Sequence, residues 1–269
     1  MLDPQFLPIL LVGAGRMGGA LVAGWRLAGV IRPADLIIRD PHPGPEALAA
    51  VLAGASLDPP DHTIQTARTV ILAVKPQAWR TMAAEIAPLL APDACVISIL
   101  AGVGAEDLKS AFGARDIARV MPTTAAAISK GTASIWSASM AGGARARHLF
   151  EPLGSVVALE RESLMHVATA ASGSAPAYLY AFLEALEAAA VANGLDPKTA
   201  ATMTRSTLTG AAALLEQSSE DPGELRRQVT SPGGTTQAAL EILMGPQGLQ
   251  PLLQSAVAAA VGRSQALGG

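Results

Sequence analysis

The chain reads Ile9-Leu10-Leu11-Val12-Gly13-Ala14-Gly15-Arg16-Met17-Gly18 close to its amino end. The apolar residues predict a buried strand, and the glycine-rich segment behind them predicts a tight turn into a helix. Gly13 would allow the turn, Gly15 would let the backbone approach a pyrophosphate, and Gly18 would let the helix pack on the strand. The positive end of that helix would face the phosphates. We predict that the residues from Gly13 to Gly18 contact a dinucleotide; the alternative is a glycine-rich turn that binds nothing.

Short apolar runs alternate with helical stretches as far as residue 159. Further strands are predicted at residues 36–38, 70–74 and 96–99, and each run is continuously apolar, as expected of strands with helices on both faces. Beyond residue 161, Ala, Leu, Glu and Met favour helices at residues 163–194, 197–217 and 249–267. We predict an α/β fold. A doubly wound, Rossmann-type parallel sheet would form a dinucleotide-binding domain at residues 1–160, and an all-helical domain for substrate binding and dimerisation would follow at residues 161–269.

The composition indicates a folded protein, since 50% of the residues are apolar and 15% are charged. A formal net charge of −3 gives no broad basic surface, so we expect no nucleic acid and no anionic membrane as partners. The residues before Pro8 lack the pattern of a signal peptide, and the apolar run 167–183 is interrupted by Ser, Gly and Pro. We therefore expect a cytoplasmic protein in which this run is a core helix rather than a membrane span. The single cysteine, Cys95, is expected to be buried and structural, and no cluster of metal ligands is predicted.

The predicted second strand ends in Arg39 and Asp40, beside the expected place of the adenosine ribose. An acid there favours the 2′-hydroxyl of NAD, whereas an arginine can pair with the 2′-phosphate of NADP. The choice between NADPH and NADH therefore stays open, and a solvated pair of charges is the alternative. Because parallel strands place ligands at their carboxyl ends, further cofactor contacts are predicted at Val74, Lys75, Pro76, Ala101, Gly102 and Met121.

A second turn lies late in the chain, at Val229-Thr230-Ser231-Pro232-Gly233-Gly234-Thr235-Thr236. A helical stretch stops there and a new helix begins, which would expose consecutive backbone N–H groups at a positive helix end. Such a turn could hold a carboxylate. Another helix start, Ser172-Gly173-Ser174-Ala175-Pro176-Ala177-Tyr178, carries small polar residues at its head, with a capped helix that binds nothing as the alternative.

In these last two segments the chain resembles the pyrroline-5-carboxylate reductases. The segments Gly13 to Ala20, Val74 to Gln77 and Arg119 to Pro122 are similar to that family in the same order, so the resemblance covers essentially the whole chain. It implies an NADPH- or NADH-dependent reductase of a cyclic imine carboxylate, built as an intertwined helical homodimer or a higher homo-oligomer. It also implies that the Thr236 hydroxyl bonds the ring nitrogen, while the substrate carboxylate is held by the backbone around Ser231, Gly233, Gly234 and Thr235.

Three residues depart from the family's pattern. Thr123 stands where Asn is common, and Ala175 and Ala239 stand where Gly is common. The two alanines add only a methyl group each. Thr123 is the more serious change, because it removes an amide that could help to position the nicotinamide or the substrate.

A nicotinamide would supply the hydride, so no catalytic histidine is required and the protein's part is placement and electrostatics. Three alternatives stay open. A dehydrogenase of the β-hydroxyacid type would use a lysine in the helical part, where Lys198 beside Pro197 is the only one and is poorly placed. A reductase of a six-membered ring is not distinguished, since one methylene is worth about 1–3 kcal/mol. A regulator without catalysis is favoured by Thr123 alone, and the intact segment 231–236 argues against it.

Overall fold

The computed structural model describes residues 1–267. Within them the strands form one sheet of eight: β1 (Ile9–Val12), β2 (Leu36–Arg39), β3 (Ser56–Leu57), β4 (Thr69–Leu72), β5 (Cys95–Ser98), β6 (Ile117–Pro122), β7 (Gly131–Ser137) and β8 (Gly154–Ala158). The helices between the strands are α1 (Arg16–Ala28), α2 (Pro45–Leu52), α3 (Asp61–Ile64), α4 (Trp79–Ile86), α5 (Ala105–Phe112) and α6 (Met140–Phe150). Short 3₁₀ turns lie at Pro4–Phe6, Pro33–Asp35, Ala87–Leu89, Thr124–Ile128 and Glu151–Leu153.

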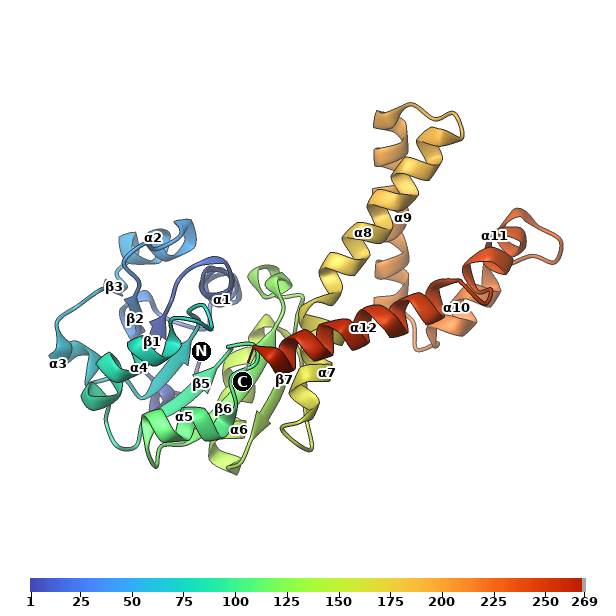
Figure 1. Ribbon diagram of the computed structural model, residues 1–269. Coiled ribbons are helices and arrows are strands. Elements are labelled where there is room, and N and C mark those ends of the chain that lie inside the picture. The colour runs from blue at the N-terminus through green and yellow to red at the C-terminus, as the bar shows by residue number, and fades with distance from the viewer. Residues whose placement is uncertain (268–269) are drawn as a thin grey trace. The chain divides into compact units, whose positions relative to one another are not determined.

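The later part of the chain is helical, as predicted (Figure 1, yellow to red). It consists of α7 (Leu164–Ala168), a π-helical segment (Thr169–Gly173), α8 (Ala175–Ala192), α9 (Pro197–Gln217), α10 (Pro222–Gln228), α11 (Thr235–Leu243) and α12 (Leu249–Ala266). The predicted helix at residues 197–217 is confirmed with the same bounds.

The strand order is β3-β2-β1-β4-β5-β6-β7-β8. The pairs from β3 to β6 are parallel, β6 and β7 are antiparallel, and β7 and β8 are parallel again. The order therefore reverses between β1 and β4, and this switch point is where doubly wound sheets bind dinucleotides. The predicted fold class is confirmed, with β7 and β8, which run antiparallel to the other strands, as additions that the sequence did not predict.

Strands β1, β4, β5 and β6 are buried on both faces, because their successive side chains point to opposite sides and other elements cover each side. Ile9 and Leu11 join a core with α1, α2 and α6, whereas Leu10 and Val12 join a second core with α3, α4 and α5. All four side chains are at most 1% exposed. Continuous apolar strands with helices on both sides thus hold the carboxyl edge of the sheet in place.

Contacts divide the chain into two compact units, one of Met1–Gly173 with the segment from Ala260, and one of Ser174–Ala259. The division differs from the predicted one after residue 160, because α7 and the π-helical segment pack on β7 and β6. The end of α12 belongs to the first unit as well. In that unit His166 on α7 and Ser264 on α12 share a hydrogen bond of 3.0 Å.

The second unit has almost no interior of its own. Ala200 and Thr204 on α9 are the only buried residues between 174 and 259, and α8 has none. The run Leu164–Ala192 is apolar and long enough to cross a membrane by length and composition alone, and its most apolar window is not buried. The expectation of a core helix is therefore wrong for the chain taken by itself: the apolar side chains of α8 have no partner surface inside the unit large enough to cover them.

Candidate functional site

The glycine turn, Gly13–Gly18, sits at the switch point of the sheet, between β1 and α1. Gly13 has φ +93°, and a Cβ there would lie 2.7 Å from the backbone of Ala73 after β4. A Cβ on Gly18 would lie 2.1 Å from the carbonyl oxygen of Gly13. Both positions therefore require glycine to let the turn, the helix and the neighbouring strand approach one another.

Gly15 is different, because a Cβ there would meet no atom of the chain within 4 Å. The fold itself does not demand glycine at this position, so the space is free for a group from outside. Across residues 1–267, no side chain caps the amino end of α1, and its first turn holds Arg16 but no acid. A bare helix end beside a basic residue and an open backbone fits the pyrophosphate of a dinucleotide.

Asp40 at the end of β2 is tied to the glycine turn. Its Oδ2 accepts a hydrogen bond of 2.5 Å from the Ala14 N–H, and its Oδ1 accepts one of 2.8 Å from the His42 N–H. The Gly44 N–H donates to the Ala14 carbonyl oxygen at 3.1 Å. Both backbone groups of Ala14 are thus held by the segment after β2, a contact that no pattern in the sequence indicates. Arg39, the other predicted residue here, lies 3.7 Å from the Oδ1 of Asp58.

The predicted contacts at the other strand ends lie directly after β4 and β5 and near the end of β6, on the carboxyl edge of the sheet. Val74 and Pro76 are partly buried and Lys75 is exposed. The Ala73 N–H donates to the Val12 carbonyl oxygen, which locks this segment beside the glycine turn. Pro76 also borders a hollow of about 230 Å³ that reaches Val103 after β5.

Ala101 and Gly102 form the turn after β5, where Gly102 has φ +84° and is buried. Met121 on β6 is 7% exposed. Its sulfur lies 3.1 Å from where a Cβ of Gly173 would be, so Gly173 must be small for the two segments to touch. The structure therefore brings Met121 against Gly173, near the start of the Ser172–Tyr178 motif.

Thr123 has a structural task. Its N–H donates to the Thr132 carbonyl oxygen at 3.0 Å, and its hydroxyl accepts from the Thr132 N–H at 3.0 Å. The side chain, 7% exposed, closes the connection between β6 and β7. Thr123 thus takes part in the pairing of β6 and β7 through its N–H and its hydroxyl oxygen.

An ion pair with one buried partner, Arg119, holds the first residue of α5, directly behind the turn after β5. The Glu162 Oε1 accepts from the Arg119 Nη1 at 2.8 Å and from the Ala105 N–H at 2.6 Å. The Arg119 side chain is 4% exposed and that of Glu162 is 28% exposed. His166, one turn further along, has its pKa lowered by burial and then by the charge of Arg119. No sequence signal marks Glu162, because its partners lie on other elements.

The second predicted site, the proline-glycine turn (Ser231–Thr236), joins α10 to α11 in the second unit. Gly233 has φ +69°, its N–H donates to the Gln237 Oε1 at 2.7 Å, and the Gly234 N–H donates to the Ser231 carbonyl oxygen at 3.0 Å. The N-cap residue of α11 is Gly234, which has no side chain with which to cap the helix. The N–H groups of Thr235 and Thr236 therefore belong to an open first turn.

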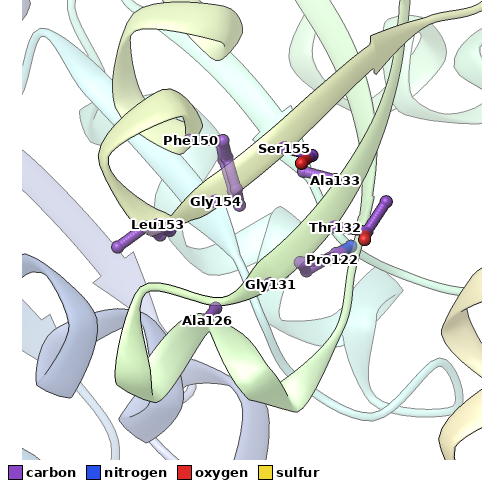
Figure 2. Close-up of a pocket in the computed structure, with 9 residues that line it drawn as sticks. All are labelled: Pro122, Ala126, Gly131, Thr132, Ala133, Phe150, Leu153, Gly154 and Ser155. Carbon is purple, nitrogen blue, oxygen red and sulfur yellow. The ribbon is translucent and has the colours of Figure 1, made fainter. Parts of the chain in front are cut away.

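One depression of the first unit is a packing seam rather than a site. Figure 2 shows its lining, which is built from Pro122, Ala126, Gly131, Thr132, Ala133, Phe150, Leu153, Gly154 and Ser155. It has no room for a water molecule and no titratable side chain.

The single cysteine is not reactive either. Cys95 is buried, and burial raises the pKa of its thiol to about 12. Among residues 1–267, no group of three or more His, Cys, Asp or Glu side chains could hold a metal ion.

Comparisons with known proteins cover both units. Residues 162–267 match the family model for pyrroline-5-carboxylate reductase dimerisation, and residues 8–102 match the model for coenzyme F420-dependent NADP oxidoreductases. A pyrroline-5-carboxylate reductase of Pseudomonas aeruginosa is 35% identical over 266 residues, which is 96% of each chain. The chain belongs to the pyrroline-5-carboxylate reductase family.

Solved structures of the family agree with this assignment. A pyrroline-5-carboxylate reductase from Coxiella burnetii has a TM-score of 0.88 at 28% identity and covers 98% of this chain and 99% of its own. The pyrroline carboxylate reductase of Plasmodium falciparum, solved with NADP bound, has a TM-score of 0.85 at 26% identity, with 99% and 100% covered. Membership in the pyrroline-5-carboxylate reductase family makes the chain an NAD(P)H-dependent oxidoreductase, which confirms the predicted enzyme class and cofactor type.

Proposed function

We propose that this chain reduces the C=N bond of 1-pyrroline-5-carboxylate to give L-proline. The observation that carries the proposal is the relative that is 35% identical over 96% of both chains, because that match includes the helical unit and not only the dinucleotide sheet. A shared dinucleotide sheet alone would not distinguish this activity from that of other dehydrogenases. Reduction of an imine adds a hydride to carbon and a proton to nitrogen, so the protein must hold a ring, a carboxylate and a nicotinamide together.

The nicotinamide supplies the hydride when it is bound. The glycine turn, Arg39, Asp40 and the ends of β4, β5 and β6 are proposed to hold the dinucleotide, with the pyrophosphate at the amino end of α1. The glycines of this turn and the open space at Gly15 support that role. The turn after β5, which Glu162 ties down through the Ala105 N–H, would then fix the reactive end.

The proline-glycine turn is proposed to bind the substrate. The N–H groups of Gly233 and Gly234 are used within the turn itself, so these residues shape it, and the N–H groups of Thr235 and Thr236 are left for a carboxylate. The Thr236 hydroxyl can accept a hydrogen bond from a protonated ring nitrogen and so orient the C=N bond. Ser231 would complete the carboxylate site through the backbone.

We also propose that the chain functions as a homodimer or a higher homo-oligomer. Support comes from the matched dimerisation model and from the second unit, in which Ala200 and Thr204 alone are buried. Exposed apolar side chains line α8 and continue on the later helices. A second copy of the same unit would cover them. A cytoplasmic location is proposed as well, since the only thiol is buried and unpaired.

The function is tested by incubating the purified protein with 1-pyrroline-5-carboxylate and either NADH or NADPH, and by measuring both the loss of the reduced nicotinamide and the proline formed. One proline formed for each reduced nicotinamide consumed supports the proposal. The six-membered imine carboxylate serves as the matched competitor. A higher kcat/KM for that ring, or no proline with either cofactor, would overturn the assignment.

A further inference from the structure

The residues that end β2 decide which dinucleotide a doubly wound sheet accepts, because they lie beside the adenosine ribose. A carboxylate there accepts a hydrogen bond from the 2′-hydroxyl of NADH, whereas an arginine pairs with the 2′-phosphate of NADPH. This chain carries one of each, Arg39 and Asp40. The sequence does not decide between them, but their contacts do.

Asp40 is fixed against the glycine turn. The register pairs Val12 with Arg39, so Asp40 comes beside Gly13 as the strands end. Its two carboxylate oxygens accept from the N–H groups of Ala14 and His42, at 2.5 and 2.8 Å. Each oxygen keeps a second lone pair, so the carboxylate can still accept from a ribose hydroxyl. Turning the side chain away would leave the Ala14 N–H without this partner.

Arg39 faces a carboxylate of its own. Its Nε lies 3.7 Å from the Oδ1 of Asp58, and both side chains are 37% exposed. Asp58 follows β3 and is held in place by its N–H, which donates to the Ile38 carbonyl oxygen at 2.8 Å. Two carboxylates and one guanidinium therefore gather at this strand end. Arg16, the first residue of α1, and Lys75, after β4, are the cations on the neighbouring elements.

We propose that Asp40 makes this chain select NADH over NADPH. The inference rests on the proposed function as a nicotinamide-dependent reductase and adds its cofactor preference. A 2′-phosphate at the β2 end would meet the anchored carboxylate as a like charge, and Arg39 would have to leave Asp58 to offset it. The 2′-hydroxyl of NADH could instead donate a hydrogen bond to the Asp40 carboxylate. The chain would thus differ from its relative solved with NADP bound.

The test measures dinucleotide binding to the full-length protein without imine, by titration calorimetry with NADH and NADPH. The wild type is expected to bind NADH at least about tenfold more tightly. Asp40→Asn keeps an oxygen that can accept from the Ala14 N–H but removes the charge, so the ratio of the two Kd values should fall about tenfold. Asp58→Asn frees Arg39 and should strengthen NADPH binding without weakening NADH binding.

Asp116→Asn is the matched control, because Asp116 is exposed and precedes β6 at the opposite edge of the sheet. It removes the same charge and should leave the ratio unchanged. Equal or tighter binding of NADPH by the wild type would overturn the proposal, and so would a ratio that neither Asp40→Asn nor Asp58→Asn alters. Failure of the proposed function looks different: the protein would bind neither dinucleotide, or would bind NADH and still not reduce the imine.

Discussion

Two glycines of the same turn are glycine for different physical reasons. Gly18 is required by the protein, since a Cβ would lie 2.1 Å from the Gly13 carbonyl oxygen. Gly15 has open space around it, so only a bound group would exclude a methyl there. The side-chain space around each glycine thus separates a folding requirement from a binding requirement, which the glycine pattern in the sequence does not.

Alanine at the two positions should therefore give opposite results. Gly18→Ala should lower the free energy of unfolding by about 3 kcal/mol, because helix and turn must separate. Gly15→Ala should stay within about 0.5 kcal/mol of the wild type but weaken dinucleotide binding about tenfold or more. Denaturant titration and calorimetry measure the two effects. Gly19→Ala is the control, because its methyl would make only ordinary contacts at 3.8 and 3.9 Å. A Gly15→Ala protein with unchanged affinity would contradict the assigned role.

Thr236 should matter through its hydroxyl alone. Thr236→Ala is expected to reduce kcat for the imine by about tenfold to a thousandfold, since the ring nitrogen loses its orienting partner. Thr236→Ser should recover most of the rate, and dinucleotide affinity should not change in either variant. Thr230→Ala provides the comparison, because that hydroxyl donates to the Arg226 carbonyl oxygen within α10. Full-rate turnover by Thr236→Ala would rule out the role.

At the scale of elements, the sequence predicted those strands and helices that have a clear local pattern of residue types. The strands β1, β2, β4 and β5 came from continuous apolar runs, and α9 and α12 came from helix-forming composition with Pro197 as a start signal. β3 has two residues, and β7 mixes polar and apolar ones, so neither produces a clear pattern. The Asp40 bond to Ala14 and the Thr123 bonds to Thr132 depend on which strands become neighbours, and single-residue patterns do not carry that information.

The turn after β5 is held by an ion pair whose two ends differ in exposure. Glu162→Gln should lower the free energy of unfolding by about 2 kcal/mol, because it leaves the Arg119 guanidinium buried without a counter-charge. Unfolding of the protein without cofactor in guanidinium chloride measures this loss of stability. In the exposed pair of Arg147 and Glu151, the change Glu151→Gln should cost less than about 0.5 kcal/mol. Equal effects in both variants would show that burial of Arg119 does not determine the cost.

At the scale of the whole molecule, the two units differ in how they are stabilised. The first has two cores, on either side of the sheet, and the second is a set of helices whose apolar side chains remain exposed. Inside the second unit, α8 and α9 pack on each other, with the Glu187 carboxylate accepting from the Arg205 Nε at 3.0 Å (Figure 1). Such a unit buries too little surface to fold well alone, so its stability must come from another surface.

Leu186 on α8 is the position at which to test that surface. It lies in one stripe with Leu179 and Phe182, and it is 40% exposed in the single chain. Leu186→Glu should convert the oligomer largely to monomer at micromolar concentration, because a charge would be buried between copies without a partner. Sedimentation velocity over a range of concentrations measures this. Leu52→Glu on α2 is the matched control, since Leu52 is 91% exposed in the first unit and the change there should leave association intact. A wild-type protein that stays monomeric, or two variants that associate equally well, would mean that the apolar stripe of α8 is not where the copies meet.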